Sequence, residues 1–137
     1  MAGKITNDGR KFVGENINIG LGVSSSTTEA FTHLEIGTGS TGATVTDSGI
    51  ETALATGGRV AATSGYPKVT FTGTVIIVEV MATFAAGTFT TGTPITEAAW
   101  VDSLGTVCAG RGILDASKDP TAAEPLTVTA KFELVAN

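Results

Sequence analysis

The sequence is poor in charge, in cysteine and in long hydrophobic runs. Charged residues make up 15% of its 137 positions, whereas an average soluble domain has roughly 25%. The one cysteine, Cys108, cannot form an internal disulfide or a thiolate metal cluster, and its small apolar neighbours predict that it is buried. The longest apolar run, residues 75–78, is too short to span a membrane. The residues after Met1 lack the apolar segment of a signal peptide, so we expect a chain that stays, or is assembled, in a cytosol.

Basic residues are too few and too scattered to form a nucleic-acid groove. Eight Lys and Arg stand against thirteen Asp and Glu, which gives a formal net charge of −5. Phosphate binding needs a clustered basic surface. No stretch has the regularly spaced acidic residues of a calcium loop. The sequence therefore predicts no nucleic-acid partner, no metal site and no cofactor.

The residues that could carry catalysis are isolated from one another. His33 is the only histidine, so we expect a structural role on a strand and no nucleophile with its base. Residues 37–42 match Gly-x-Gly-x-x-Gly, but β-branched residues follow where a nucleotide-binding loop would open a helix. Spacing alone pairs none of the acids that a hydrolase could use, which are Asp47, Glu51, Glu79, Glu97, Asp102 and Asp115. We expect no enzymatic activity, and an ion pair of Glu97 with Arg111 or Arg59.

Small residues dominate what is present, with 18 glycines, a similar number of alanines and about two dozen threonines. Threonine and valine favour strands, and glycine interrupts them at turns. We therefore predict an all-β chain, in which residues 31–137 form an antiparallel β-sandwich that is jelly-roll-like or barrel-like. At most one short helix is expected, capped by Asp47 or Ser48 and ended at Gly57.

Strands are expected at residues 31–36, 69–84, 95–102, 106–114 and 126–135. The last alternates cleanly through Leu134, with apolar residues from Leu126 to Leu134 inward and polar ones from Thr127 to Glu133 outward. The 69–84 segment is apolar on both faces from Val75 onward, which predicts a central strand covered on both sides. We expect the 69–84 and 126–135 strands to form the core and a subunit interface.

Residues 1–30 differ from the rest of the chain in their residue pattern and are predicted to form an extended N-terminal arm. Between residues 13 and 23, odd positions are mostly apolar and even ones are glycine or asparagine. A strand with one glycine face is stabilised only where another backbone approaches closely. We therefore expect assembly contacts from the arm, and a solvated terminus is the alternative. The predicted assembly residues are Val13, Ile17, Ile19, Leu21, Val23, Ile76, Val78 and Trp100.

Five blocks in fixed order resemble small structural proteins of tailed bacteriophages, described as head decoration, head fibre, tail fibre or baseplate components. They are residues 31–39, 46–51, 95–98, 105–111 and 126–130. The resemblance implies a capsid decoration (cement) protein of the virion that is made in the host cytoplasm. It implies a homo-oligomer, most simply a trimer, that binds the major capsid protein or another virion structural protein.

A tail, baseplate or fibre component that binds a receptor glycan is the alternative. Such a protein would bind its ligand through the loops at residues 37–42 and 87–93, where exposed aromatic side chains should occur. Phe89 is the one aromatic residue there. Trp100 lies in a short apolar stretch, which favours a core or subunit-interface anchor over a ligand-stacking platform.

Overall fold

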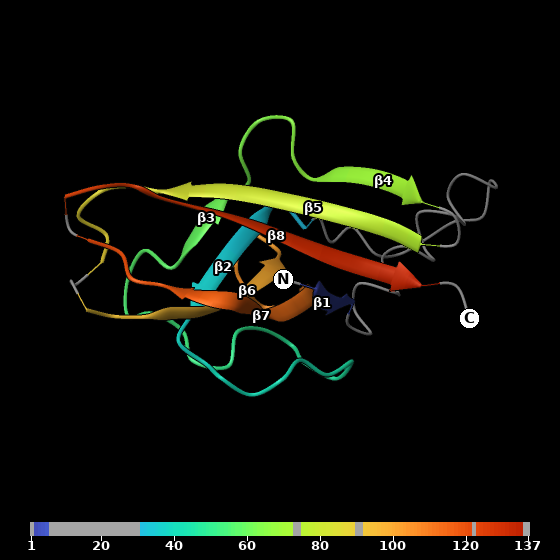
Figure 1. Ribbon diagram of the computed structural model, residues 1–137, viewed down its shortest axis with the longest axis horizontal. Coiled ribbons are helices and arrows are strands. Elements are labelled where there is room, and N and C mark those ends of the chain that lie inside the picture. The colour runs from blue at the N-terminus through green and yellow to red at the C-terminus, as the bar shows by residue number, and fades with distance from the viewer. Residues whose placement is uncertain (1, 6–30, 73–74, 90–91, 122, 136–137) are drawn as a thin grey trace.

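The computed structural model describes residues 2–5, 31–72, 75–89, 92–121 and 123–135, and these form an all-β fold (Figure 1). No helix occurs within these ranges. The strands are β1 (Ala2–Ile5), β2 (His33–Gly37), β3 (Arg59–Ala61), β4 (Lys68–Thr72), β5 (Val75–Phe84), β6 (Ile95–Val101), β7 (Cys108–Lys118) and β8 (Leu126–Val135).

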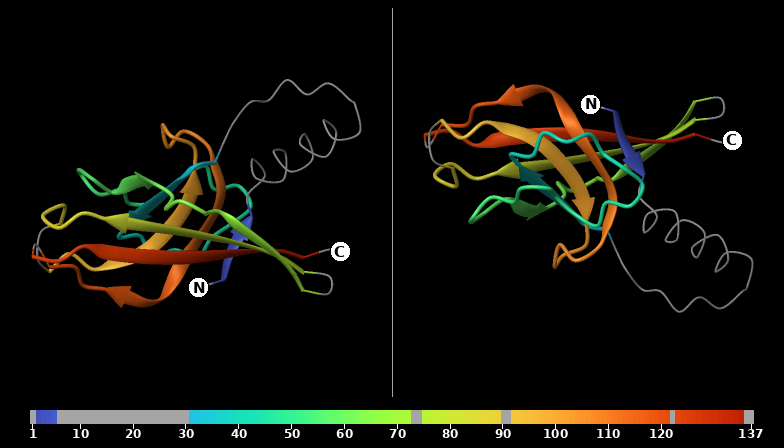
Figure 2. Two further views of the ribbon diagram at one scale, coloured as in Figure 1. Left: turned by 90° about the horizontal axis from the view of Figure 1, so that it is seen from above. Right: turned by 90° about the horizontal axis from the view of Figure 1, so that it is seen from below.

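The eight strands form one curled sheet in the order β3-β2-β6-β7-β1-β8-β5-β4. Strand β1 lies antiparallel to β7 and parallel to β8, and it joins a four-stranded half to a three-stranded half. All other neighbours are antiparallel. The halves pack face to face (Figure 2). Just after β3, Thr63 N donates to Met81 O of β5 at 2.8 Å, which joins the two halves a second time. The predicted antiparallel sandwich, with a barrel-like curl, is confirmed.

The core lies between the two halves. The inward row of β5 runs from Val78 to Phe84 and meets Val128 to Phe132 of β8. Opposite them lie the apolar side chains of β2 and β6. Trp100 stacks on Phe132 with ring centroids 6.2 Å apart, and it meets Phe31 edge-on at 5.6 Å. Its indole Nε1 donates to Phe31 O at 2.7 Å, so its one polar atom is paired inside the core.

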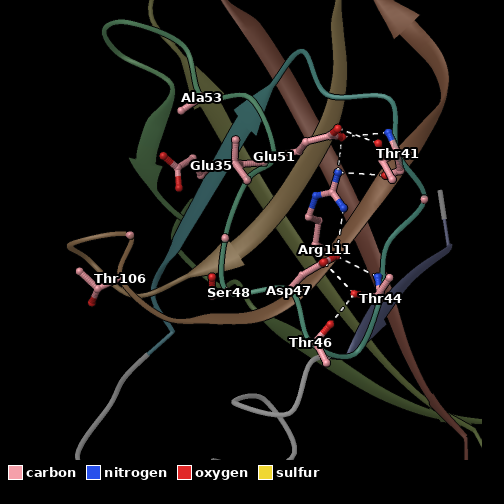
Figure 3. Close-up of a pocket in the computed structure, with 14 residues that line it drawn as sticks. Glu35, Thr41, Thr44, Thr46, Asp47, Ser48, Glu51, Ala53, Thr106 and Arg111 are labelled. Carbon is pink, nitrogen blue, oxygen red and sulfur yellow. Dashed lines mark hydrogen bonds and ion pairs between the residues drawn. The ribbon is translucent and has the colours of Figure 1, made fainter.

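A second, smaller cluster lies on the opposite face of β6. Ala99 and Val101 of β6 and Cys108 of β7 are fully buried there, and Ile50 packs over them. Ile50 belongs to the irregular segment of residues 38–58, which crosses the outer face of β6 and β7 (Figure 3). Strand β6 is therefore covered on both faces, by the core on one side and by this loop on the other.

The strand expected over residues 106–114 is β7, which begins at Cys108 and continues to Lys118. Two other expected elements are replaced by different structures. The short helix after Asp47 does not form, because the carboxylate of Asp47 binds back to Thr44 and that of Glu51 reaches Thr41 and Arg111. The single strand expected over residues 69–84 is instead the antiparallel hairpin of β4 and β5. Both segments are rich in Val, Ile and Thr, so alternation alone did not reveal that one strand ends at Thr72 and the next begins at Val75.

Strand β8 has the predicted bounds. Its inward residues Val128, Ala130 and Phe132 are buried, Leu126 is partly buried, and its described outward residues are exposed. Residues 2–5, which the sequence places in the arm, form β1 between β7 and β8. The rest of the arm, residues 6–30, lies outside the described residues.

Candidate functional site

An open depression of about 610 Å³ lies in the described part of the surface (Figure 3). It lies between the 41–53 part of the loop and the turn that joins β6 to β7. Its wall is polar, with threonine hydroxyls, acidic side chains and one arginine. The main lining residues are Glu35, Thr44, Asp47, Glu51, Thr106 and Arg111.

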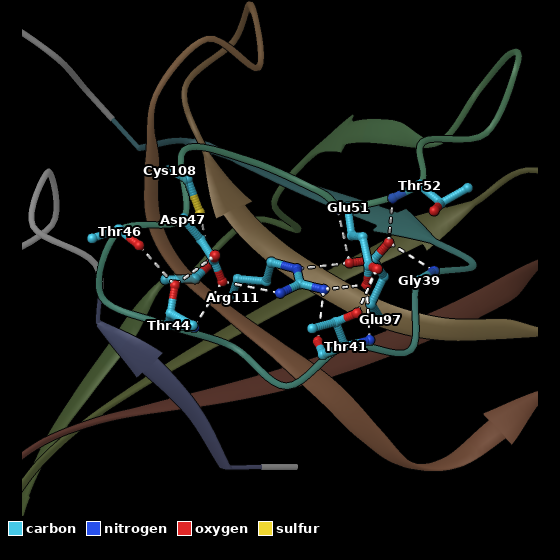
Figure 4. A network of polar contacts seen from close by, with 11 residues as sticks. Gly39, Thr41, Thr44, Thr46, Asp47, Glu51, Thr52, Glu97, Cys108 and Arg111 are labelled. Carbon is cyan, nitrogen blue, oxygen red and sulfur yellow. Dashed lines mark hydrogen bonds and ion pairs between the residues drawn. The ribbon is translucent and has the colours of Figure 1, made fainter.

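Arg111 is the centre of a buried ionic cluster at the base of this depression (Figure 4). Its Nε donates to Glu97 Oε2 at 2.7 Å, and its Nη1 donates to Asp47 Oδ2 at 3.0 Å. Its Nη2 donates to Glu51 Oε2 and to Thr41 O, both at 3.0 Å. The Arg111 side chain is only 3% exposed. One guanidinium thus joins strand β7 to strand β6 and to two points of the covering loop.

Glu97 is the partner of Arg111 within the sheet. In the register of β6 and β7, Glu97 pairs with Ile113 and Ala99 with Arg111, so the two charged residues are diagonal neighbours on one face. Glu97 Oε1 accepts from Gly39 N and Thr52 N at 2.9 Å, and Oε2 accepts from Glu51 N at 3.1 Å as well as from Arg111. All these donors except Arg111 are amides of the loop. The fully buried carboxylate therefore fastens the loop to β6.

The two loop carboxylates are also fully engaged. Asp47 accepts from Thr44 N and Oγ1, both at 2.8 Å, and Glu51 accepts from Thr41 N at 2.8 Å and Oγ1 at 2.7 Å. Burial acts to raise the pKa of Asp47, but the hydrogen bonds from Thr44 and Arg111 outweigh it and hold that pKa below its ordinary value. Hydrogen bonds from Thr41, aided by the charge of Arg111, likewise lower the pKa of Glu51. Both groups are anionic where they meet Arg111.

Asp102 and Glu35 lie beside the cluster with separate roles. Asp102 closes the turn between β6 and β7, because its carboxylate accepts from the amides of Leu104, Thr106 and Val107. Burial opposes but does not cancel these bonds, so the pKa of Asp102 is lowered. Burial raises the pKa of Glu35, which pairs with Arg59 at 3.4 Å.

In the glycine-rich run of residues 37–42, backbone amides donate hydrogen bonds to carboxylates of the protein itself. Gly39 N donates to Glu97 and Thr41 N donates to Glu51, the kind of donors that a bound phosphate would need. A Cβ at Gly39 would lie 2.5 Å from Glu97 Oε1, so glycine permits this close approach. The run is therefore part of the cluster, and no helix follows it in the described chain.

The expected ion pair of Glu97 with Arg111 is confirmed, and Arg59 pairs with Glu35 instead. Of the six candidate acids, the fold brings Asp47, Glu51 and Glu97 together around one cation. His33 lies away from this cluster, with its Nδ1 2.8 Å from Thr32 Oγ1. The sequence signal for the convergence of Asp47 and Glu51 on Arg111 is weak. It consists of two acidic residues in a threonine-rich loop, far from Arg111 along the chain.

The predicted assembly residues fall into three groups. Val13, Ile17, Ile19, Leu21 and Val23 lie outside the described residues, and so does the side chain of Ile76. Val78 and Trp100 are 8% and 7% exposed and pack in the core of the single chain. Their contribution to a subunit interface stays a prediction.

Phe89, the aromatic that a glycan-binding loop would need at its surface, is buried. It is 6% exposed, and its ring centroid lies 5.9 Å from that of Phe84. Within the described ranges, no cluster of three or more His, Cys, Asp or Glu has the arrangement to hold a metal ion. In the same ranges, none of the secondary structure is a helix long and apolar enough to cross a membrane.

Comparison of the chain with protein-family models, curated proteins and solved structures gives no match.

Proposed function

We propose that the protein is a non-enzymatic virion structural protein of a tailed phage, and specifically a capsid decoration protein. It binds the head shell, through the major capsid protein or another virion structural protein, as a symmetric homo-oligomer, for which a trimer is the simplest arrangement. It is made in the host cytoplasm and resides on the capsid surface. The five sequence blocks that resemble small phage structural proteins are the starting point of this proposal.

The observation that carries the proposal is where these blocks lie in the fold. Four of the five supply the ionic cluster: the first gives Gly39, the second Asp47 and Glu51, the third Glu97 and the fourth Arg111. The shared feature is thus a device that fastens a long loop to a sheet. A shell component needs such a rigid surface, because each copy must present the same contacts to the lattice.

The buried charges support a structural role for the same reason. The buried charged residues of the described chain are Glu97, Asp102 and Arg111. Each is hydrogen-bonded to neighbouring backbone groups, and Glu97 and Arg111 also bind opposite charges. A catalytic group must instead aim a polar atom at a substrate. This arrangement favours a scaffold over an enzyme.

A sedimentation assay tests the proposal. Purified protein is mixed with undecorated heads and, separately, with tail tubes of the same phage, and the pelleted fraction is measured. We expect binding to heads at a fixed ratio of copies per shell. Binding to tail tubes alone would replace the capsid proposal by the tail, baseplate or fibre alternative, and binding to neither would reject both.

The role of the arm needs a variant that leaves β1 in place. Deleting the first residues would remove a strand that lies between β7 and β8. A triple substitution of Ile17, Ile19 and Leu21 by serine instead leaves residues 2–5 intact. We expect this variant to stay folded and to lose binding to heads, and wild-type affinity would show that the arm makes no assembly contact.

A further inference from the structure

Strand β4 ends the sheet with a free backbone edge. It pairs with β5 along its whole length on one side, and it has no backbone partner on the other side among the described residues. The C-terminal ends of β4 and β8 and the N-terminal end of β5 also extend together beyond the other strands (Figures 1 and 2). An unpaired row of N–H and C=O groups is a ready template for another strand.

Only at its first end does the edge of β4 have features by which proteins usually block such pairing. Charged residues, prolines and bulges serve that purpose. Lys68 is the only charged residue of β4, and Pro67 lies just before the strand. Val69 is 56% exposed although its register with Val78 places it on the inner face of the sheet. An apolar side chain thus remains in solvent at an open edge.

The other sheet end, β3, is less suited to pairing. It has three residues and begins with Arg59, which pairs with Glu35. The chain that follows turns to β5, where Thr63 N donates to Met81 O. A five-residue strand with one charge is the better acceptor.

The sequence of β4 suits a second copy of itself. In an antiparallel pair centred on Thr70, all five residues find a partner: Lys68 lies opposite Thr72, and Val69 opposite Phe71. Apolar positions then meet apolar positions, and the two Lys68 side chains are kept apart. A slip by one residue would pair Val69 with a residue of the opposite face. Centring on Val69 or Phe71 would leave part of the strand unpaired.

We propose that the free edge of β4 pairs antiparallel with β4 of a second copy, about a two-fold axis at Thr70. This rests on the homo-oligomer of the proposed function and specifies one of its contacts. Because the contact is two-fold, it yields assemblies with an even number of chains. It gives a dimer by itself, and it joins trimers in pairs if a trimer forms through another surface.

Light scattering after size-exclusion chromatography tests the contact with two matched variants. Val69→Lys places a charge at the proposed contact, whereas Leu104→Lys makes the same change at a 70% exposed residue in the turn between β6 and β7. Both positions are exposed, so both variants should fold. We expect an even-numbered wild type, a halved mass for Val69→Lys and an unchanged mass for Leu104→Lys. An odd-numbered wild type, or equal masses for all three proteins, would overturn the proposal.

Cysteine cross-linking tests the register. Thr70→Cys should cross-link to its own copy with a short thiol reagent. Lys68→Cys and Thr72→Cys should react when mixed but not separately, because two copies of residue 68 lie about 14 Å apart at about 3.4 Å per residue. Thr129→Cys on the exposed face of β8 and the wild type, whose Cys108 is buried, serve as blanks. Cross-linking of Lys68→Cys alone would indicate parallel pairing and refute the register.

The results of the oligomer and cross-linking experiments can be distinguished from those of the head-binding assay. An odd-numbered protein that binds heads rejects only the β4 contact. An even-numbered protein that shows the expected cross-links but binds no heads rejects the capsid proposal and retains the contact.

Discussion

Replacing Arg111 by methionine should lower the free energy of unfolding by about 3–5 kcal/mol, the range expected when one partner of a buried ion pair is removed. Methionine keeps most of the aliphatic length but removes all four described hydrogen bonds of the guanidinium. The main cost falls on Glu97, which is fully buried and would lose its only cationic partner among the described residues. Asp47 and Glu51 add less, because their side chains are 21% and 36% exposed and water can solvate them.

Urea unfolding followed by the fluorescence of Trp100, the only tryptophan, measures this loss. Arg59→Met is the matched control, because Arg59 is 35% exposed and its ion pair with Glu35 is 3.4 Å long. We expect it to cost less than about 1 kcal/mol. Equal costs for Arg59→Met and Arg111→Met would refute the reasoning.

A double-mutant cycle measures the coupling between Arg111 and Glu97 directly. Glu97→Gln in the Arg111→Met background removes the uncompensated charge while keeping an oxygen for the loop amides. The double variant should therefore be less destabilised than the sum of the two single changes, with a coupling energy of about 0.5–3 kcal/mol. Strict additivity would mean that the two side chains do not stabilise each other.

Three further predictions follow from the same contacts. Gly39→Ala should destabilise the protein, because the new Cβ would meet the Glu97 and Glu51 carboxylates, whereas Gly42→Ala has nothing within 4 Å and should be nearly neutral by urea unfolding. The stability should fall as the pH drops below 4.5 and 3.8, the ordinary pKa values of Glu51 and Asp47, because a lowered pKa in the folded state stabilises only while the carboxylate is charged. Asp47→Asn should make this decline shallower in urea midpoints measured across the acidic range, and an unchanged slope would argue against it. Asp102→Ala should cost about 1–3 kcal/mol and speed amide exchange at positions 104, 106 and 107, because their amides lose the Asp102 acceptor.

The strand pattern was predictable where one face is buried and the other is wet. Strand β8 was predicted to its end residues, because its apolar and polar positions alternate without interruption. The β4 and β5 hairpin was not, because both of its segments carry β-branched residues on both faces and the pattern continues across the break. Strand β1 was missed for another reason. Its four residues, Ala2–Ile5, have no marked periodicity, and they find their place only between β7 and β8.

The sequence alone determined the class of the fold and narrowed one pair of the site. Low charge with many threonines and glycines favoured short strands and turns, and the residue pattern predicted that Glu97 pairs with Arg111 or Arg59, of which the fold selects Arg111. Tertiary structure decided the rest. Asp47 and Glu51 reach Arg111 only because the irregular loop folds back over β6 and β7. The open edge of β4 exists only because of its place at the end of the strand order. Both depend on contacts between distant segments, and local residue patterns do not encode the order in which strands pair.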